Sequence, residues 1–141
     1  MVFLKLLRDE GRLDDLDLDA RDAGEALART VRQVDAWCRE AGAQRPSALN
    51  LVATNGRVLA ATRRGRPLSY ALLEGIVPCA VHGLQPGAPE ADAQLRSHRV
   101  VKAVCFATHL TSPNGFLEVP ESSVAAVSRN LQVSISPLPG H

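Results

Sequence analysis

Two short alternating segments joined by Asn55-Gly56 constrain the fold of this chain more than any other feature. In residues 49–54 (LNLVAT) and 57–62 (RVLAAT), apolar side chains occupy both sets of alternating positions, so both faces of the predicted strands are largely apolar. Asn-Gly between such segments predicts a two-residue hairpin turn in which both residues take positive φ. A hairpin that is apolar on both faces needs a covering layer on each side, helices on one and a further layer on the other.

A long helix is predicted from residue 20 to residue 41, because apolar side chains recur there every three or four positions. Asp19 stands where an N-cap belongs, and Gly42 stands where helices commonly end in glycine. The apolar residues 2–7 predict a shorter helix, and the acidic residues 13–19 (LDDLDLD) between the two helices predict a solvated connector. The polar face of the long helix is expected to contact water, and it carries Arg29, Arg32, Asp35, Arg39 and Glu40.

The rest of the chain adds strands and one irregular segment. Alternating or continuously apolar segments predict strands at residues 68–73, 100–108, 123–127 and 131–136, the last two joined as a hairpin around Arg129-Asn130. Residues 75–95 are rich in Pro, Gly and Ala, which predicts an irregular excursion. The 141 residues fit one domain of the α/β (α+β) class, mostly antiparallel sheet with packed helices.

Charge and composition argue against several classes of partner. With 16 basic and 15 acidic residues, the chain has no electrostatic basis for binding nucleic acid or a membrane surface. No apolar run approaches the roughly 20 residues that span a bilayer, and no signal peptide precedes the three cysteines. An odd number of widely spaced cysteines favours a reduced, cytoplasmic protein without disulfides.

Two Cys-His pairs have spacings that could suit metal ligands or a nucleophile with its base. Cys79 lies three residues before His82, and Cys105 lies four residues before His109. A structural zinc site needs four ligands in a recognisable pair of pairs, and no second pair stands at such a spacing. Cys105 lies within an apolar strand, where a small buried thiol is the ordinary interpretation. We therefore predict no metal ligand, no cofactor and no catalytic residue; an independent enzyme using Cys105 and His109 is the least favoured alternative.

Other short motifs have structural interpretations. Arg63-Arg64-Gly65-Arg66 could bind an anion, but a solvated loop at the end of a strand is favoured. Asn114-Gly115, after Ser112-Pro113, predicts a tight turn. Ser69 lacks the glycines of a G-x-S-x-G elbow, and no glycine-rich phosphate loop occurs in the sequence.

Several segments, taken in order, resemble a known enzyme family. Residues 49–62 (LNLVATNGRVLAAT), 68–70 (LSY), 101–108 (VKAVCFAT) and 116–120 (FLEVP) resemble the C-terminal half of class II glutamine amidotransferases, the stand-alone type that includes the ergothioneine-pathway amidohydrolase. The resemblance covers most of the chain. Phe116 stands where relatives commonly have Trp, and Thr108-His109 stands where they have Ser-Glu or Ser-Gln.

The resemblance implies a fold and a reaction. The fold is the αββα sandwich of the N-terminal nucleophile hydrolases, and the complete enzyme would hydrolyse glutamine or a γ-glutamyl amide to glutamate and ammonia or an amine. Its nucleophile is a Cys at residue one, whereas this chain begins Met1-Val2. The resemblance therefore implies that residues 1–141 are a partial domain without its catalytic half, inactive alone, with no catalytic residue to carry over.

Two kinds of partner follow from this interpretation. An exposed apolar sheet face is expected to contact the missing N-terminal half or to self-associate. The alternative function is a non-catalytic α/β module that uses the same face to bind another protein.

Overall fold

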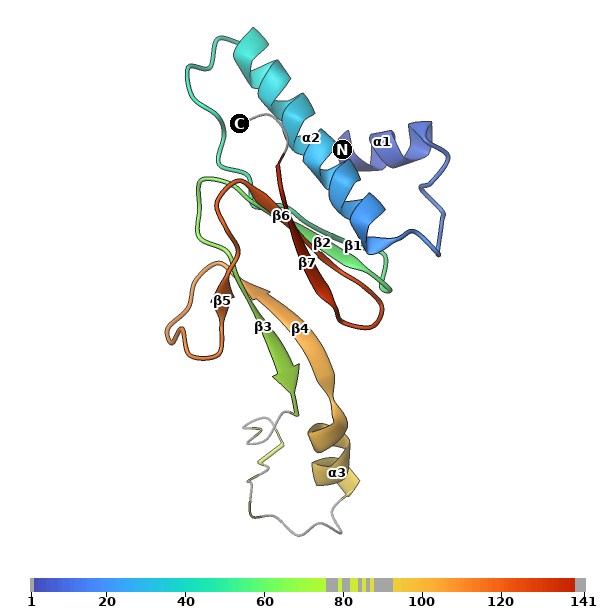
Figure 1. The fold of residues 1–141 in the computed structure, drawn as a ribbon, viewed down its shortest axis with the longest axis vertical. Coiled ribbons are helices and arrows are strands. Elements are labelled where there is room, and N and C mark those ends of the chain that lie inside the picture. Colours follow the sequence, from blue (N-terminus) through green and yellow to red (C-terminus); the bar gives the residue numbers. More distant parts are fainter. Residues whose placement is uncertain are drawn as a thin grey trace.

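The computed structural model describes residues 2–75, 79, 82–83, 85, 87 and 93–138. Within them the elements follow the order α1 (Val2–Asp9), α2 (Ala20–Glu40), β1 (Val52–Thr54), β2 (Leu59–Arg63), β3 (Ser69–Glu74), α3 (Ala93–Val100), β4 (Lys102–Ala107), β5 (Leu117–Glu118), β6 (Ser123–Val127) and β7 (Val133–Pro137) (Figure 1). The strands form two antiparallel sheets, which we call sheet A (order β1-β2-β6-β7) and sheet B (order β4-β3-β5). The predicted mixture of antiparallel sheet and packed helices is confirmed.

The two N-terminal helices form where the sequence predicts them. The Asp19 carboxylate accepts a hydrogen bond of 2.8 Å from the Arg21 backbone N–H, which caps α2. After α2 the chain turns at Gly42, whose φ of +88° is accessible to glycine at little cost. Arg12 donates a 2.7 Å hydrogen bond from Nη2 to the Asp22 carboxylate, which ties the acidic connector to α2 and raises the pKa of Arg12.

The central strands of sheet A, β2 and β6, are covered on both faces, as the two-sided apolar hairpin predicts. Ala60 pairs with Ala126, and both are buried in a core cluster with α1 and α2. The next pair along the ladder, Ala61 and Ala125, points to the opposite face and is buried in a second cluster with Leu68, which precedes β3. The order of layers is therefore helices, sheet A and sheet B.

The helix layer packs closely on sheet A because α2 presents small residues to it. A Cβ added to Gly24 would lie 3.1 Å from Val124 Cγ1 and 3.5 Å from Ala126 Cβ. We expect Gly24→Leu to lower the free energy of unfolding by about 1–3 kcal/mol, because the larger side chain would force α2 away from the sheet. Urea denaturation measures this change.

The matched control for Gly24→Leu is Glu25→Leu, at the neighbouring position of α2. The Glu25 side chain is 55% exposed and makes only a surface ion pair with Arg21. Losing such a pair is worth about 0.3–0.5 kcal/mol. Equal urea midpoints for the two variants would show that Gly24 does not set the distance between helix and sheet.

The predicted two-residue turn at Asn55-Gly56 is wrong. Thr54 pairs with Leu59, so four residues connect β1 to β2, and among them only Gly56 has positive φ, +82°. The Asn55 carboxamide oxygen accepts hydrogen bonds of 3.0 Å from the backbone N–H groups of Arg57 and Val58. An Asn side chain that satisfies two amides stabilises this wider turn, which needs no positive φ at Asn55.

The segment before β1 is held to β2 by both backbone and side-chain hydrogen bonds. The Thr62 N–H donates to the Leu51 carbonyl and the Leu49 N–H donates to the Arg64 carbonyl, both at 2.9 Å. Thr62, fully buried in β2, donates from its hydroxyl to the Leu49 carbonyl (3.0 Å) and accepts from the Leu51 N–H (3.0 Å). Residues 49–51 therefore follow the sheet without forming strand, and β1 is shorter than predicted.

The other predicted strands form, and the structure adds one helix and the short strand β5, which were not predicted. β3, β6 and β7 form at the predicted places, and β6 pairs with β7 around Arg129-Asn130. The predicted strand from residue 100 begins instead at Lys102, because Val100 ends α3, a helix that was not predicted. Of the predicted irregular segment, residues 76–78, 80–81, 84, 86 and 88–92 lie outside the described residues.

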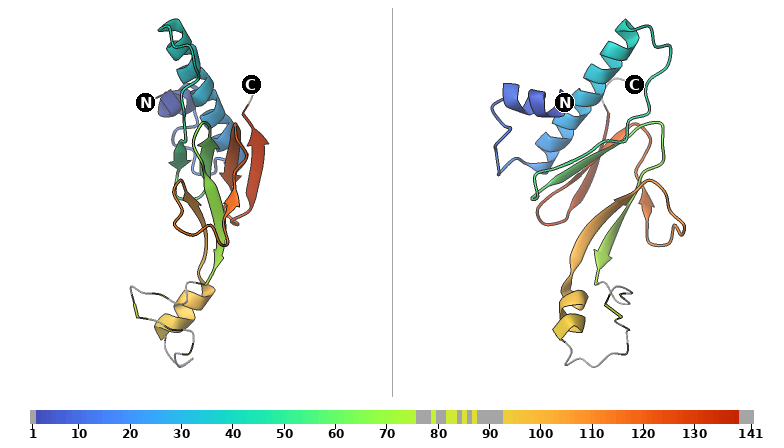
Figure 2. Two further views of the ribbon diagram at one scale, coloured as in Figure 1. Left: turned by 90° about the vertical axis from the view of Figure 1, so that its left-hand side faces the viewer. Right: turned by 180° about the vertical axis from the view of Figure 1, so that it is seen from behind.

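Sheet B extends away from the helix layer. In Figures 1 and 2, β3 and β4 run as a ribbon from the level of sheet A to α3, which lies at the opposite end of the molecule from α1 and α2. None of the helices within the described residues has the length and apolar character needed to cross a membrane.

Candidate functional site

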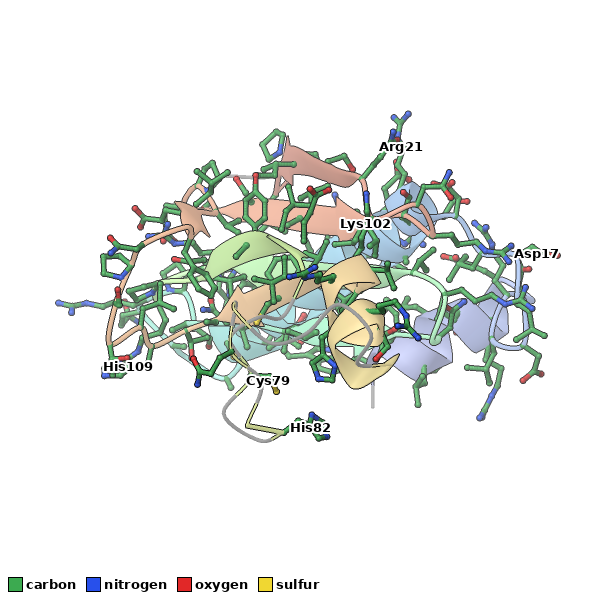
Figure 3. The ribbon with its side chains drawn as sticks, turned by 90° about the horizontal axis from the view of Figure 1, so that it is seen from below. Asp17, Arg21, Cys79, His82, Lys102 and His109 are labelled. Atoms are coloured by element: carbon green, nitrogen blue, oxygen red, sulfur yellow. The ribbon has the colours of Figure 1, made fainter. Side chains whose placement is uncertain are left out.

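One cluster of metal-binding side chains lies at the α3 end of the molecule. Cys79 forms an isolated β-bridge after β3, His82 lies in the following turn, and His98 belongs to the last turn of α3. Figure 3 shows Cys79 and His82 together at this end. The donor atoms of the three residues all lie within 4.8 Å of one another, and no other such group of His, Cys, Asp and Glu occurs in the part of the chain that the structure describes.

The β3–β4 ribbon brings the cluster together. Its ladder continues past the strand ends, where the Gly75 N–H donates to the Val101 carbonyl at 2.8 Å. A Cβ at Gly75 would lie 3.4 Å from the Arg99 carbonyl oxygen, and the φ of Gly75 is +75°. Glycine at this position therefore lets the chain leave β3 directly beside the end of α3, which carries His98.

The distances within the cluster are short. His82 Nδ1 lies 3.5 Å from Cys79 Sγ and 3.0 Å from His98 Nε2. The two imidazole rings meet edge to face, with centroids 4.9 Å apart. The other ring nitrogen of His98, Nδ1, lies 3.5 Å from the Ser97 hydroxyl, so the polar partner of Nδ1 is separate from the cluster. Such an arrangement suits a metal ion, and the Cys79–His82 contact alone would also suit a thiol–imidazole pair.

The sequence pointed to two members of this cluster and missed the third. The Cys79-x-x-His82 spacing is that of a ligand pair, but the sequence shows no second pair beside it. His98, 16 residues after His82, supplies another donor from α3. The missed signal was His98 shortly before β4. Because β3 and β4 pair, the residues that follow β3 and those that precede β4 lie close together.

The second Cys-His pair is not brought together. Cys105 is half-buried, and its thiol contacts the Phe106 carbonyl oxygen at 3.8 Å. In Figure 3 His109 lies at one edge of the view, apart from Cys79 and His82 near its centre. No hydrogen bond joins Cys105 to His109 in the described ranges, and the geometry offers this pair no support as nucleophile and base. Cys38 is a further half-buried thiol, 3.5 Å from the Ser47 hydroxyl.

The prediction of a solvated arginine loop is wrong for its first two members. Arg64 is only 4% exposed and donates from Nη2 to the Asp35 carboxylate at 2.7 Å, with a second, parallel bond from Nη1. Its Nε donates to the Ser47 carbonyl at 2.8 Å. Asp35 is itself 9% exposed, so its expected place on the solvated face of α2 is also wrong. Residues distant in sequence pair here, which local patterns do not reveal.

Arg63 is also removed from water, since its side chain is 13% exposed. It pairs with Glu118 at 2.6 Å and donates to the Val119 carbonyl, which links sheet A to the start of the connection after β5. The arginine cluster thus joins the two sheets and α2, and it is not an anion site.

The other predicted structural motifs are confirmed. Residues 112–115 form a turn in which Gly115 has a φ of +79° and the Phe116 N–H donates to the Pro113 carbonyl at 3.0 Å. In the acidic connector, Asp17 has a side chain that is 83% exposed, and it pairs with Arg57 at 3.0 Å.

Both faces of sheet B are partly uncovered where the ribbon extends beyond sheet A. Tyr70 packs toward sheet A, so β3 residues that are two or four positions from Tyr70 lie on the same face. On the same face Leu72 and Leu117 are 57% and 58% exposed. Leu73, which points to the opposite face, is 37% exposed. Apolar surface on both sides of one strand is typical of a sheet that packs against further layers.

The helix layer over sheet A is also incomplete. A groove of about 430 Å³ lies beside α2, over β6 and the edge strand β7. Gly24 of α2 and Val124 of β6 line the groove, and β7 borders it. Ile135 of β7 is 40% exposed, but its pairing with Ala125 places it on the opposite face of sheet A.

No protein-family model and no curated protein matches this chain. A functional proposal therefore rests on the residues and layers themselves.

Proposed function

We propose that this chain is the C-terminal part of a class II glutamine amidotransferase domain, a scaffold that supports glutamine hydrolysis when the N-terminal half is present. The observation that carries the proposal is the order of layers. Helices cover one face of sheet A, sheet B lies on its other face, and the far face of sheet B is partly exposed at Leu73. An αββα sandwich adds one more helix layer at that face.

The far face of sheet B has side chains suited to such a layer. Ala71 pairs with Cys105, and Leu73 pairs with Ala103, all on the face opposite Tyr70. Small apolar side chains allow a helix to approach a sheet closely, as Gly24 of α2 does over sheet A.

The chemistry of the family defines what this chain would contribute. In class II enzymes the Cys at residue one attacks the amide carbon of the glutamine side chain, its α-amine serves as base, and ammonia leaves. None of the three cysteines here lies at the N-terminus, and each is a free thiol inside the fold or the β3–β4 connection. The proposed role is therefore structural support of the sheets that carry the reacting groups.

The chain alone is expected to release no ammonia from glutamine above the protein-free rate. Oxyanion donors and nucleophile supply most of the rate in acyl transfer, and one donor alone is worth about a hundredfold or more. The measurement is a coupled ammonia assay on the purified 141-residue chain. Glutaminase activity that disappears when one of Cys38, Cys79 or Cys105 is replaced by Ala would contradict the proposal.

A complementation experiment tests the positive part of the proposal. The chain is co-refolded with the N-terminal half of a stand-alone class II glutamine amidotransferase, and association is followed by size-exclusion chromatography. We expect a complex that releases ammonia and that loses this activity when the N-terminal Cys of the added half is replaced by Ser. Leu73→Arg should prevent association, whereas Leu4→Arg, at an equally exposed leucine (37%) on α1, should not.

The remaining outcomes separate the scaffold from the interaction module. Failure of the two polypeptides to associate would count against the amidotransferase proposal. Self-association of the chain that is abolished by Leu73→Arg would favour the non-catalytic module, whose only supporting observation is the same exposed apolar surface.

A further inference from the structure

We propose that Cys79, His82 and His98 bind a Zn²⁺ ion, which fastens the connection after β3 to helix α3. The ligand atoms are Cys79 Sγ, His82 Nδ1 and His98 Nε2. The site is independent of the proposed amidotransferase scaffold, because it lies at the end of the ribbon opposite the helix layer (Figure 1).

The donor set and its spacing fit a tetrahedral ion. With Zn–S near 2.3 Å and Zn–N near 2.0–2.1 Å, adjacent vertices of a tetrahedron lie about 3.6 Å apart for S and N and about 3.3 Å apart for two nitrogens. The distances here are 3.5 Å from Cys79 Sγ to His82 Nδ1 and 3.0 Å from His82 Nδ1 to His98 Nε2. All three donor atoms lie within 4.8 Å of one another, so side-chain rotation can bring them around one ion.

The chemistry of the ligands selects the class of metal. One thiolate and two imidazoles form a borderline-soft set that suits Zn²⁺ and disfavours Mg²⁺ and Ca²⁺, which prefer oxygen ligands. The contact of His98 Nδ1 with the Ser97 hydroxyl at 3.5 Å leaves Nε2 as the ligand nitrogen and orients the ring, as outer partners of metal-bound histidines commonly do. With three protein ligands, the fourth position of the tetrahedron is open to a water molecule, on the side of the exposed His82.

The ion would close a long excursion of the chain. Cys79 and His82 follow β3, whereas His98 precedes β4, so one ion joins both ends of the connection between two paired strands. The ligands come together only when the connection is folded. The free energy of metal binding therefore stabilises the folded connection.

A thiol–imidazole nucleophile pair is the competing interpretation of Cys79 and His82. It accounts for the 3.5 Å contact between them but gives no role to His98 at 3.0 Å from the same imidazole nitrogen. Two imidazole nitrogens 3.0 Å apart lie at hydrogen-bond distance and close to the about 3.3 Å that separates two nitrogen ligands of one ion, and the metal interpretation uses all three donors.

The test is titration of the full chain with Co²⁺ as a spectroscopic probe, followed by displacement with Zn²⁺. We expect one equivalent of Co²⁺ to give a thiolate-to-cobalt charge-transfer band and tetrahedral d–d absorption. Cys79→Ser should remove the charge-transfer band. His82→Asn and His98→Asn should weaken Zn²⁺ binding more than about 100-fold, since loss of an outer-shell partner alone costs 10–100-fold.

The chain supplies matched controls in Cys105→Ser and His109→Asn, the same residue types outside the cluster. Both should retain the spectrum and the affinity of the unaltered chain. Zn²⁺ should also slow alkylation of Cys79 by iodoacetamide, measured by peptide mass spectrometry, and leave alkylation of Cys38 unchanged. His82→Asn changes an exposed side chain, so its effect can be measured even if a Cys79 variant folds poorly.

Three results would overturn the proposal. A Co²⁺ spectrum without a thiolate band, equal Zn²⁺ affinity in His82→Asn and the unaltered chain, or alkylation of Cys79 at the same rate with and without Zn²⁺ would each exclude this site. The last result, with rapid alkylation, would favour the thiol–imidazole pair.

Discussion

Replacement of Asp35 by Ala is expected to lower the free energy of unfolding by about 3–5 kcal/mol, more than any exposed charge in the chain. Asp35 and Arg64 are 9% and 4% exposed, and they are joined by two parallel hydrogen bonds. Removing the carboxylate leaves the Arg64 guanidinium buried with only the Ser47 carbonyl as its remaining acceptor, at 2.8 Å. A desolvated charge without its counter-ion is the source of the cost.

Equilibrium urea denaturation of Asp35→Ala measures this effect. The control is Asp9→Ala, which removes the exposed partner of Lys5 in α1, where the two side chains are 53% and 72% exposed. A surface pair of this kind is worth about 0.2–1 kcal/mol at most. A similar small change for Asp35→Ala would show that the Asp35–Arg64 pair remains solvated.

A double variant separates the loss of the pair from the burial of a lone charge. Asp35→Leu with Arg64→Met removes both charges and keeps most of the side-chain volume, and such replacements are often neutral or stabilising. We therefore expect the double variant to be more stable than Asp35→Ala. A double variant less stable than Asp35→Ala would show that the ion pair itself stabilises the fold. The loss of stability in Asp35→Ala would then not come from the unpaired Arg64 charge.

Leu68→Ala is expected to destabilise the chain by about 2–5 kcal/mol, because it opens a cavity between the two sheets. Leu68 is 1% exposed and packs with Ala61 and Ala125 of sheet A and with Val119 after β5. Its carbonyl also accepts a 2.9 Å hydrogen bond from the Val119 N–H, which holds the backbone in place and limits collapse around the smaller side chain. The effect is measured as the shift in urea midpoint.

Leu72→Ala is the matched control, since the same residue type stands four positions later on the same face of the ribbon. Leu72 is 57% exposed, and we expect its truncation to change stability by no more than about 0.5 kcal/mol in the isolated chain. Equal effects of the two substitutions would show that the sheets do not pack at Leu68.

Periodicity predicted several of the elements that pack against a neighbouring layer. In α2, apolar side chains every three or four positions and the Asp19 cap were enough to predict the helix. The pairing of β6 with β7 around Arg129-Asn130 followed from alternation and a short connection. The two-sided apolar character of residues 57–62 predicted that β2 has a layer on each face, which Ala60 and Ala61 confirm.

Local rules failed where a side chain took over the role of the backbone. The Asn55 carboxamide caps two N–H groups and widens the turn. The Thr62 hydroxyl accepts from the Leu51 N–H where a regular ladder would use a carbonyl, while backbone hydrogen bonds at Leu49 and Leu51 remain. Both residues are common in turns and strands, so their identity alone does not reveal which hydrogen bonds they make.

The sequence by itself determined the α+β class, the antiparallel strands and most of their positions, because burial on one or two faces leaves a period that can be counted. Only the tertiary structure decided that Arg64 meets Asp35 and that His98 meets Cys79 and His82. Each of these contacts joins residues from separate elements. Charged and metal-binding side chains carry no periodic signal of their partners, so the fold must first bring their elements together.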